Sequence, residues 1–253
     1  MKIKNIPCVI LSGGKSNRMG KDKSLLPFDN YDSLIEYQFS RLSNIFEEVF
    51  ISSKTDKFDF LTDKSKIIFD FDSNLYSPMI ALYSILNNIE SDKVFIITVD
   101  SPFINEDIIN QIIKEHNDFD ITVAKNSNGT HNLCGLFSKD ILNKVSLFVH
   151  DNIHQINYLI KTSNSNLINF NQDLEFQNIN SPFDYKKSLN SLKGNDKIFY
   201  LINNMKVELI DIVKRFNSDN SLNQYSHKVL FDNRIEMFFK EKQLNGKEIL
   251  SLP

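Results

Sequence analysis

The chain has no tryptophan, two cysteines and seven glycines among its 253 residues. Missing tryptophan reflects genome base composition rather than function. Cys8 and Cys134 lie far apart in apolar runs and form no Cys-x-x-Cys pair, which argues against a disulfide framework or a zinc site. The sequence also lacks a Gly-x-Ser-x-Gly elbow and a His-Glu-x-x-His helix, so nothing points to serine-hydrolase or zinc-protease chemistry.

The chain also lacks a large net charge of either sign. A net charge of −3 and a pI near 6.0 provide no basic field for nucleic acid or an anionic membrane. The apolar run between Met1-Lys2-Ile3-Lys4 and the first glycines is too short for a signal peptide or a membrane span, so we expect a cytoplasmic protein. A hydrophobic content of 41% is sufficient for a substantial core. There is no internal repeat.

The scarce glycines are concentrated in one segment, CVILSGGKSNRMGKDKSLLPF, which spans Cys8–Phe28. An apolar run ends in Ser12, and Gly13 and Gly14 follow, with Gly20 further along. Paired glycines allow a tight turn and bring backbone N–H groups close to a bound group, and cations supply the charge that phosphates need. The segment therefore predicts a triphosphate cradle, with cations at Lys15, Arg18, Lys21 and Lys23.

Two common phosphate motifs do not fit this segment. A P-loop that ended in Gly14-Lys15-Ser16 would need its first glycine at Val9, which lies in the apolar run. A dinucleotide fingerprint needs Gly-x-Gly-x-x-Gly, which the spacing of the three glycines does not provide.

Along the chain, strand-like and helix-like patterns alternate, which predicts an α/β fold with a mainly parallel sheet. In such sheets ligands bind beyond the carboxyl ends of the strands, where the glycine segment lies. The expected strands are residues 7–11, 48–52, 66–69, 93–99, 120–124 and 132–137, and the expected helices are residues 33–44, 78–89 and 104–116.

A carboxylate follows the most apolar of these strands. Asp100 comes directly after Val94–Val99 and precedes Ser101-Pro102-Phe103. A carboxylate at the end of a central strand, beside a triphosphate loop, is well placed to hold Mg²⁺, which prefers oxygen ligands and bridges phosphates. The other interpretation is that Asp100 caps the turn before Pro102.

The glycine segment resembles the signature loop of the molybdenum cofactor guanylyltransferases, the MobA proteins, within the nucleotidyltransferase superfamily. The resemblance is carried by Leu-Ser-Gly-Gly, then Arg18-Met19-Gly20 and Asp22-Lys23. It implies a Rossmann-like three-layer fold with a mainly parallel sheet, GTP as donor and Mg²⁺ as cofactor. The nucleotide-binding residues that it implies are Leu11, Ser12, Gly13, Gly14, Arg18, Lys23, Asp70 and Asp100, of which Arg18, Lys23 and Asp100 are catalytic.

In the family, the aspartate after the third strand is followed by a Gly-Pro-Leu-Ala-Gly segment that touches the nucleotide. Here that aspartate is Asp70, and Asp72 competes with it for the role. Pro78 suits the first position of a helix, but Ser77 and Leu82 stand at the nearest positions to the two family glycines.

Three residues are expected to contact the acceptor by the same resemblance. His131 stands where the family often has a His-Pro step, and it could equally be an ordinary loop histidine. Asn178 and Asn180 belong to a segment that resembles Asn-x-Asn-Thr-Pro. Ser181 and Pro182 in that segment are explained by helix capping, whereas the two asparagines are not.

The resemblance covers about residues 3 to 192, so we expect a nucleotidyltransferase domain at 1–192 and a C-terminal region of unknown role at 193–253. In that region the apolar spacing of residues 197–216 predicts a helix, and residues 229–231 and 235–239 predict a hairpin around Asp232-Asn233. Together they suggest a small α+β appendage.

The resemblance implies transfer of GMP from GTP to the terminal phosphate of molybdenum-bearing molybdopterin, with release of pyrophosphate. Its partners would be molybdopterin and molybdoenzymes or cofactor-synthesis proteins. Two alternatives stay open at this point. One is a related nucleotidyltransferase that uses CTP or another phosphate acceptor. The other is a binding protein that keeps the fold without turnover.

Overall fold

The computed structural model describes residues 2–13, 22–72 and 74–192, together with the backbone of four short strands beyond residue 198. The chain divides into two compact units, Met1–Pro182 and Phe183–Pro253. The extent of 1–192 expected for the nucleotidyltransferase domain stays a prediction.

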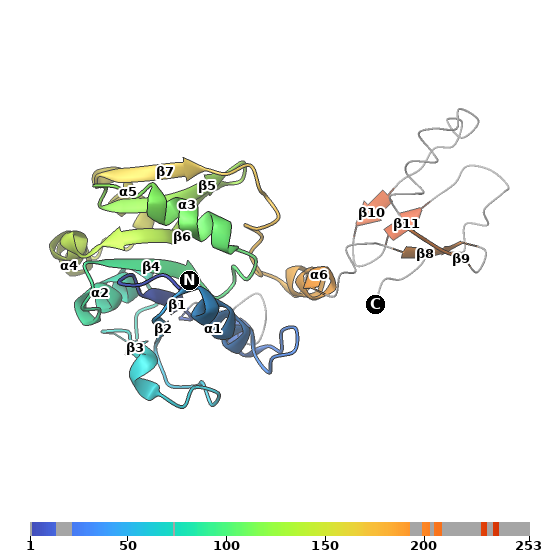
Figure 1. Cartoon of the computed structure of the whole chain (residues 1–253), viewed down its shortest axis with the longest axis horizontal. Coiled ribbons are helices and arrows are strands. Elements are labelled where there is room, and N and C mark those ends of the chain that lie inside the picture. The colour runs from blue at the N-terminus through green and yellow to red at the C-terminus, as the bar shows by residue number, and fades with distance from the viewer. Residues whose placement is uncertain are drawn as a thin grey trace. The chain divides into compact units, whose positions relative to one another are not determined.

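A seven-stranded sheet forms the centre of the first unit, in the order β3-β2-β1-β4-β6-β5-β7 (Figure 1). β6 pairs antiparallel with both of its neighbours, and the other pairings within the sheet are parallel. The expected α/β fold with a mainly parallel sheet is therefore confirmed. The strands are β1 (Cys8–Leu11), β2 (Val49–Ser53), β3 (Ile67–Phe69), β4 (Lys93–Thr98), β5 (Ile121–Asn126), β6 (Gly129–Ser138) and β7 (Ser165–Asn169).

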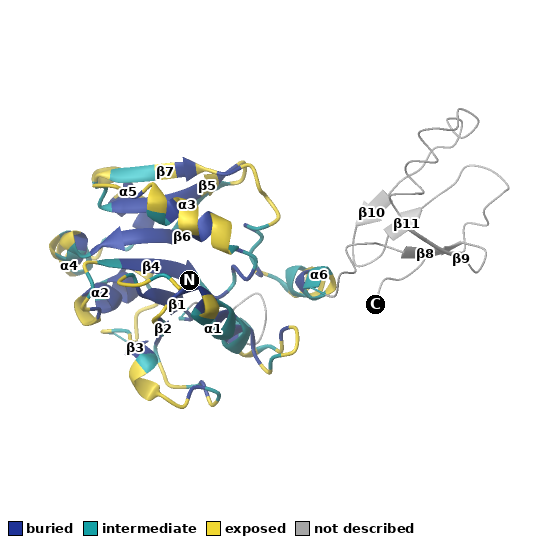
Figure 2. Cartoon of the chain, in the orientation of Figure 1, coloured by how far each residue is buried: buried dark blue, intermediate teal, exposed yellow. Residues whose placement is uncertain are grey.

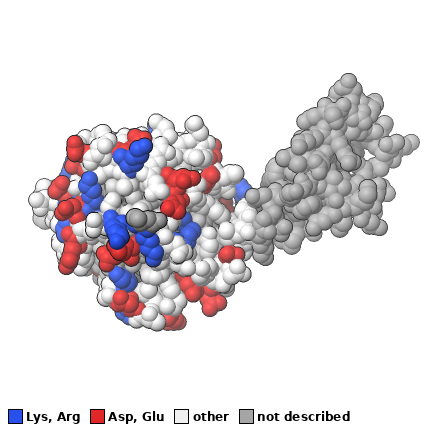
Figure 3. Space-filling view, in the orientation of Figure 1, with Lys and Arg blue, Asp and Glu red and all other residues white. Residues whose placement is uncertain are grey.

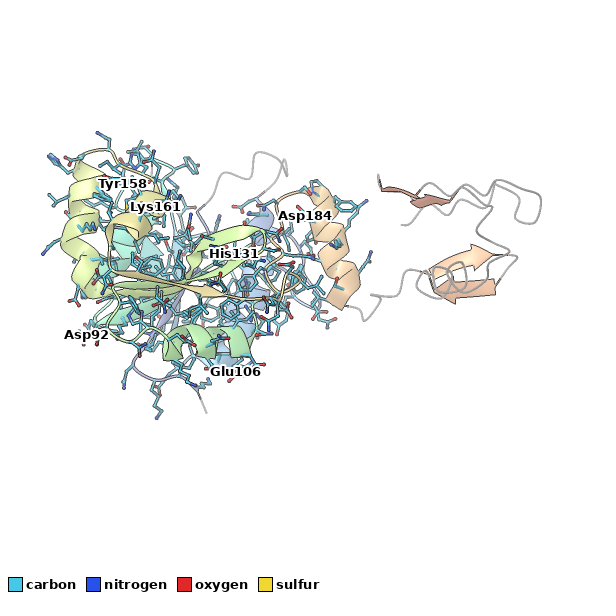
Figure 4. All side chains as sticks on the ribbon, turned by 90° about the horizontal axis from the view of Figure 1, so that it is seen from above. Asp92, Glu106, His131, Tyr158, Lys161 and Asp184 are labelled. Carbon is cyan, nitrogen blue, oxygen red and sulfur yellow. The ribbon has the colours of Figure 1, made fainter. Side chains whose placement is uncertain are left out.

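Helices cover both faces of this sheet. Tyr158 and Lys161 of α5 lie on the opposite side of the sheet from Glu106 of α3 (Figure 4). One buried cluster joins strand residues to apolar residues of α2, α4 and α5. The central strands β1 and β4 are largely buried, whereas the edge strand β7 is mostly intermediate or exposed (Figure 2). The helices are α1 (Leu34–Ile45), α2 (Pro78–Asn88), α3 (Glu106–Lys114), α4 (Leu142–His150) and α5 (Ile156–Thr162).

Helix caps explain where the three predicted helices begin. Ser33, Ser77 and Asn105 each accept a backbone N–H of the first helical turn, which satisfies donors that have no partner inside the helix. Pro78 takes the first position of α2, where its missing N–H costs nothing. These caps therefore define the residue at which each of the three helices begins.

The strand order reverses between β1 and β4, which lie side by side at the centre of the sheet. Leu11 pairs with Thr98, so the two strands end at the same level. Such a reversal is where open α/β sheets bind ligands. Ser12 and Gly13 follow one strand, and Asp100 follows the other.

The helix α6 (Pro182–Leu192) begins at the proline predicted to start it, which is the last residue of the first unit, and its other residues belong to the second unit. The helix expected over residues 197–216 is wrong in its first half, because β8 (Phe199–Ile202) and β9 (Met205–Glu208) form an antiparallel pair. The last part of the expected helix, residues 209–216, lies outside the described residues. The hairpin expected further on is confirmed as β10 (Val229–Phe231) and β11 (Ile235–Met237).

Gly135 occupies a place in β6 that tolerates no side chain. A Cβ atom there would lie 2.1 Å from the carbonyl oxygen of Thr122, at the point where the pairing of β5 with β6 shifts register. We expect Gly135→Ala to lower the free energy of unfolding by about 3 kcal/mol or more, because the neighbouring backbone must move. Gly129→Ala should cost only about 1–2 kcal/mol, since its strain comes from a φ of 126° in open space. Urea denaturation measures both, and equal losses would contradict the clash.

Both cysteines are free and buried, as the sequence predicts, and burial raises the pKa of both thiols. Among the described residues, no helix is long and apolar enough to cross a membrane.

Candidate active site

A lysine and an aspartate meet where β1 and β4 end. Lys23 Nζ lies 2.5 Å from Asp100 Oδ2, and each side chain is about one-sixth exposed, at 16% and 15%. Lys23 begins a short 3-10 helix that Asp22 caps, and Asp100 stands in the turn after β4. The structure therefore brings together two of the three residues expected to be catalytic.

A third segment closes this junction. Lys23 Nζ also donates to the carbonyl oxygen of Ile179 at 3.3 Å, and the Ile179 N–H donates to the carbonyl oxygen of Asp100 at 2.8 Å. Asn178 Oδ1 accepts a hydrogen bond from Ser101 Oγ at 2.7 Å. The turn that carries Asp100 is thus fastened to residues 178–179.

One oxygen of Asp100 has no hydrogen-bond partner among the described residues. Oδ1 is buried and accepts no hydrogen bond, whereas Oδ2 is paired with Lys23. A buried carboxylate oxygen without a donor is costly unless something binds it. An oxygen ligand of this kind suits Mg²⁺, so the residue present fits the expected ion.

Asp70 lies beside the start of the glycine segment. An ideal Cβ on Gly13 would lie 3.5 Å from Asp70 Oδ2, and Ser52 Oγ donates to Asp70 Oδ1 at 3.3 Å. Burial raises the pKa of the Asp70 carboxyl, against the opposing effect of the nearby Lys54 ammonium. Asp72 instead accepts the Asn74 N–H in its own turn. Asp70 is therefore the carboxylate that faces the glycine segment.

Lys57 is a cation of the site that sequence reasoning missed. Its ammonium pairs with Asp22 Oδ2 and donates to the carbonyl oxygen of Ser12 at 3.4 Å. Lys57 thereby links the residues on either side of the segment 14–21. Nothing in the sequence near Lys57 signals this contact, because it is made between segments 35 and 45 residues apart.

Replacing Lys57 should weaken nucleotide binding more than it slows chemistry. We expect Lys57→Met to raise the KM for GTP about fivefold, equivalent to about 1 kcal/mol, with kcat nearly unchanged. The physical reason is the loss of the link between Ser12 and Asp22. Lys64→Met is the matched control, since Lys64 pairs with Asp56 at 48% and 40% side-chain exposure. Steady-state kinetics measures both, and equal KM values for the two variants would count against the link.

The three residues expected to bind the acceptor have different surroundings. His131 Nε2–H donates to Asn126 Oδ1 at 3.0 Å, and the ring stacks on Phe176. Burial lowers the pKa of His131, so it favours the neutral ring. Asn178 is bonded to Ser101, while Asn180 is exposed. His131 belongs to β6, a strand of the central sheet (Figure 4). Acceptor binding by these residues stays a prediction.

Ser77 uses its side chain where the family has a glycine. Ser77 Oγ accepts from the N–H groups of Met79 and Ile80 and is hydrogen-bonded to His154 Nδ1 at 2.9 Å. The first turn of α2 is therefore capped by protein. Gly14 and Arg18, which the sequence assigns to the triphosphate, lie outside the described residues.

Basic and acidic side chains are interspersed on the face seen in Figure 3. In the described part of the chain no three His, Cys, Asp or Glu side chains gather as a metal-binding group. A metal ion at Asp100 would thus need other oxygen ligands, and Mg²⁺ commonly takes these from phosphates and water.

The mainly parallel sheet, with a lysine–carboxylate pair where its strand order reverses, is the arrangement expected of a nucleotidyltransferase. A sequence model described as the MobA-like NTP transferase domain matches residues 8–163, and the chain belongs to this family. The predicted family is confirmed.

Relatives agree with this assignment, and a solved structure shares the fold. A "Molybdenum cofactor guanylyltransferase" from Campylobacter jejuni subsp. doylei is 36% identical over 198 residues, which are 76% of this chain and all of the relative. One from Helicobacter pylori is 32% identical over 196 residues, covering 76% and 95%. The "Molybdopterin-guanine dinucleotide biosynthesis protein A" of Archaeoglobus fulgidus shares the fold with a TM-score of 0.63 and 16% identity, over 75% of this chain and 100% of that one.

Proposed function

We propose that this chain transfers GMP from GTP to the terminal phosphate of molybdenum-bearing molybdopterin. Pyrophosphate leaves, and the guanine dinucleotide form of the cofactor is the product. The observation that carries the proposal is the Lys23–Asp100 pair at the carboxyl ends of β1 and β4. Relatives named for this activity match three quarters of the chain, which supports it.

The chemistry requires little bond-making by the protein. An oxygen of the acceptor phosphate attacks the α-phosphorus of GTP, and the bond to the bridging oxygen breaks as pyrophosphate takes the electron pair. An ionised phosphate needs no general base. Positioning and neutralisation of charge therefore supply the rate. Lys23 provides a fixed positive charge beside Asp100, and it is assigned to the triphosphate and the leaving pyrophosphate.

Asp100 is assigned to Mg²⁺ through its unpartnered Oδ1. When bound, the ion supplies charge neutralisation to the triphosphate. Lys23 holds the other carboxylate oxygen and so fixes the plane of the carboxyl group. Asp70 is assigned to the nucleotide, because it lies against Gly13 and is half-buried.

The remaining partners follow from the proposed product. The enzyme receives molybdopterin from proteins of cofactor synthesis and supplies molybdoenzymes, and it works in the cytoplasm. The acceptor contacts are assigned to His131, Asn178 and Asn180. No nucleic acid or membrane takes part.

The test uses the purified full chain with Mg²⁺, molybdenum-bearing molybdopterin and either GTP or CTP. We expect pyrophosphate release with GTP, in equal amount to the guanine dinucleotide measured by chromatography. The rate with CTP should be at least tenfold lower, which corresponds to a difference of about 1.4 kcal/mol. Faster release with CTP would favour the cytidylyl alternative. Binding of GTP without pyrophosphate release would favour a carrier protein.

A further inference from the structure

Two polar residues of α1, Gln38 and Arg41, donate hydrogen bonds to the turn that follows β4. Gln38 Nε2 donates to the carbonyl oxygens of Thr98, Val99 and Ser101 at 3.4, 3.4 and 3.0 Å. These carbonyl groups lie on both sides of Asp100. Gln38 itself is fully buried, with 0% exposure.

Arg41 fixes the orientation of that amide. Its Nε and Nη2 atoms donate to Gln38 Oε1 at 3.1 and 2.6 Å, so the amide NH₂ group must face the turn. Arg41 Nη1 donates to the carbonyl oxygen of Ile104 at 2.5 Å, at the far end of the same turn. One glutamine and one arginine therefore hold four carbonyl groups between residues 98 and 104.

A purely structural contact would not require a charge at this place. Among residues 2–13, 22–72 and 74–192, Arg41 forms no salt bridge with a carboxylate, and burial lowers the pKa of its guanidinium. Arg41 is partly buried, and taking a cation partly out of water without a counter-ion is unfavourable compared with an apolar side chain of similar volume. The arrangement is better explained by a need to fix the turn.

Residues on the other side of the turn hold Asp100 as well. Ile179 N–H donates to the Asp100 carbonyl oxygen, and Lys23 pairs with Asp100 Oδ2. The backbone on both sides of Asp100 is thus engaged, and Oδ1 keeps one direction relative to the ends of β1 and β4. A metal ligand must be held within a fraction of an ångström to be effective.

We propose that Gln38 and Arg41 are positioning residues that fix Asp100 for the divalent cation of the reaction. This proposal rests on the proposed function, since it concerns the same site. Neither side chain touches the nucleotide or the metal; both act through the backbone of residues 98–104. The expected consequence of their loss is weaker binding of the cation with little change in metal-free nucleotide binding.

The test compares three variants of the full chain. Gln38→Leu removes the donors to the turn, and Arg41→Lys keeps the positive charge but loses the planar fork. Ser33→Ala is the control, because it removes the cap of α1 without touching the turn and so destabilises the same helix. Binding of Mn²⁺ in the presence of GTP is measured by electron paramagnetic resonance, and binding of GTP in EDTA by calorimetry.

We expect the Kd for Mn²⁺ to rise at least fivefold in Gln38→Leu and Arg41→Lys, with GTP binding in EDTA within twofold of wild type. Ser33→Ala should bind Mn²⁺ as wild type does, although its Tm is lower. Turnover of the first two variants should fall at limiting Mg²⁺ and recover at saturating Mg²⁺. A structural defect alone would not be rescued by the metal.

Equal Mn²⁺ affinities in all four proteins would overturn the proposal, and so would an equal loss in all three variants. If Gln38→Leu does not fold, Arg41→Lys decides by the same criterion. Failure of the proposed function looks different, because wild type would then bind Mn²⁺ and GTP but form no guanine dinucleotide. Tight Mn²⁺ binding lost only in the two turn variants would support the positioning role even in that case.

Discussion

Asp100→Asn should lower the rate of Mg²⁺-dependent guanylyl transfer by about a hundredfold or more, while the protein stays folded and still binds GTP. Removing the negative charge weakens the ion's attachment, and the ion stabilises charge that develops on the phosphates in the transition state. The effect should therefore fall mainly on kcat rather than on nucleotide affinity. Single-turnover rates across a magnesium titration measure it.

Asp72→Asn is the matched control for this variant. Asp72 comes shortly after β3, and it accepts the Asn74 N–H in its own turn. Its replacement should leave the magnesium dependence unchanged. Near-normal rates for Asp100→Asn across the titration would instead assign the metal to Asp70, which lies against Gly13.

Lys23→Ala should reduce GTP binding and turnover by at least about tenfold each, because a fixed cation beside the triphosphate is lost. Lys23 is mostly buried and bonded to two other segments, so its removal also leaves Asp100 without its ion-pair partner. We therefore expect a lower Tm as well, contrary to what an exposed lysine would give. Kinetics and thermal unfolding measure the two effects.

The double variant Lys23→Ala/Asp100→Asn separates these causes. With the unpaired charge removed, stability should recover towards wild type, while activity stays lost. Lys125→Ala is the control, since Lys125 is exposed on β5. Wild-type kinetics in Lys23→Ala would contradict the assignment of this residue to the triphosphate.

Local sequence patterns predicted the elements that position the site. The apolar runs of β1 and β4 are buried strands, and Pro78 and Asn105 mark the starts of α2 and α3. These signals are local, because burial on both faces requires a continuous apolar run and a helix start requires a cap. The positions of Lys23 and Asp100 at neighbouring strand ends follow from the same reasoning.

Other features could not be predicted because their cause is tertiary. Lys57 and Gln38 are ordinary polar residues in sequence, and their roles arise from contacts with distant backbone carbonyls. β7 has a single buried residue, Ile168, so it shows no alternating pattern. Residues 199–208 form an antiparallel pair of strands where the sequence predicted a helix. A short apolar segment fits both the helical and the strand periodicity, so its pattern alone does not distinguish the two.

The junction of Lys23, Asp100 and Ile179 has a consequence for how the protein is made. Lys23 reaches partners 77 and 156 positions away, so the junction closes only after nearly the whole first unit has been synthesised. Contacts of such separation form late, because loop-closure entropy must be overcome before they contribute. A fragment limited to residues 8–163, the part matched by the family, would include Lys23 and Asp100 without Ile179, which fastens them. We expect such a fragment to form most of the sheet, but its active site would lack the contacts that Ile179 makes with Lys23 and Asp100.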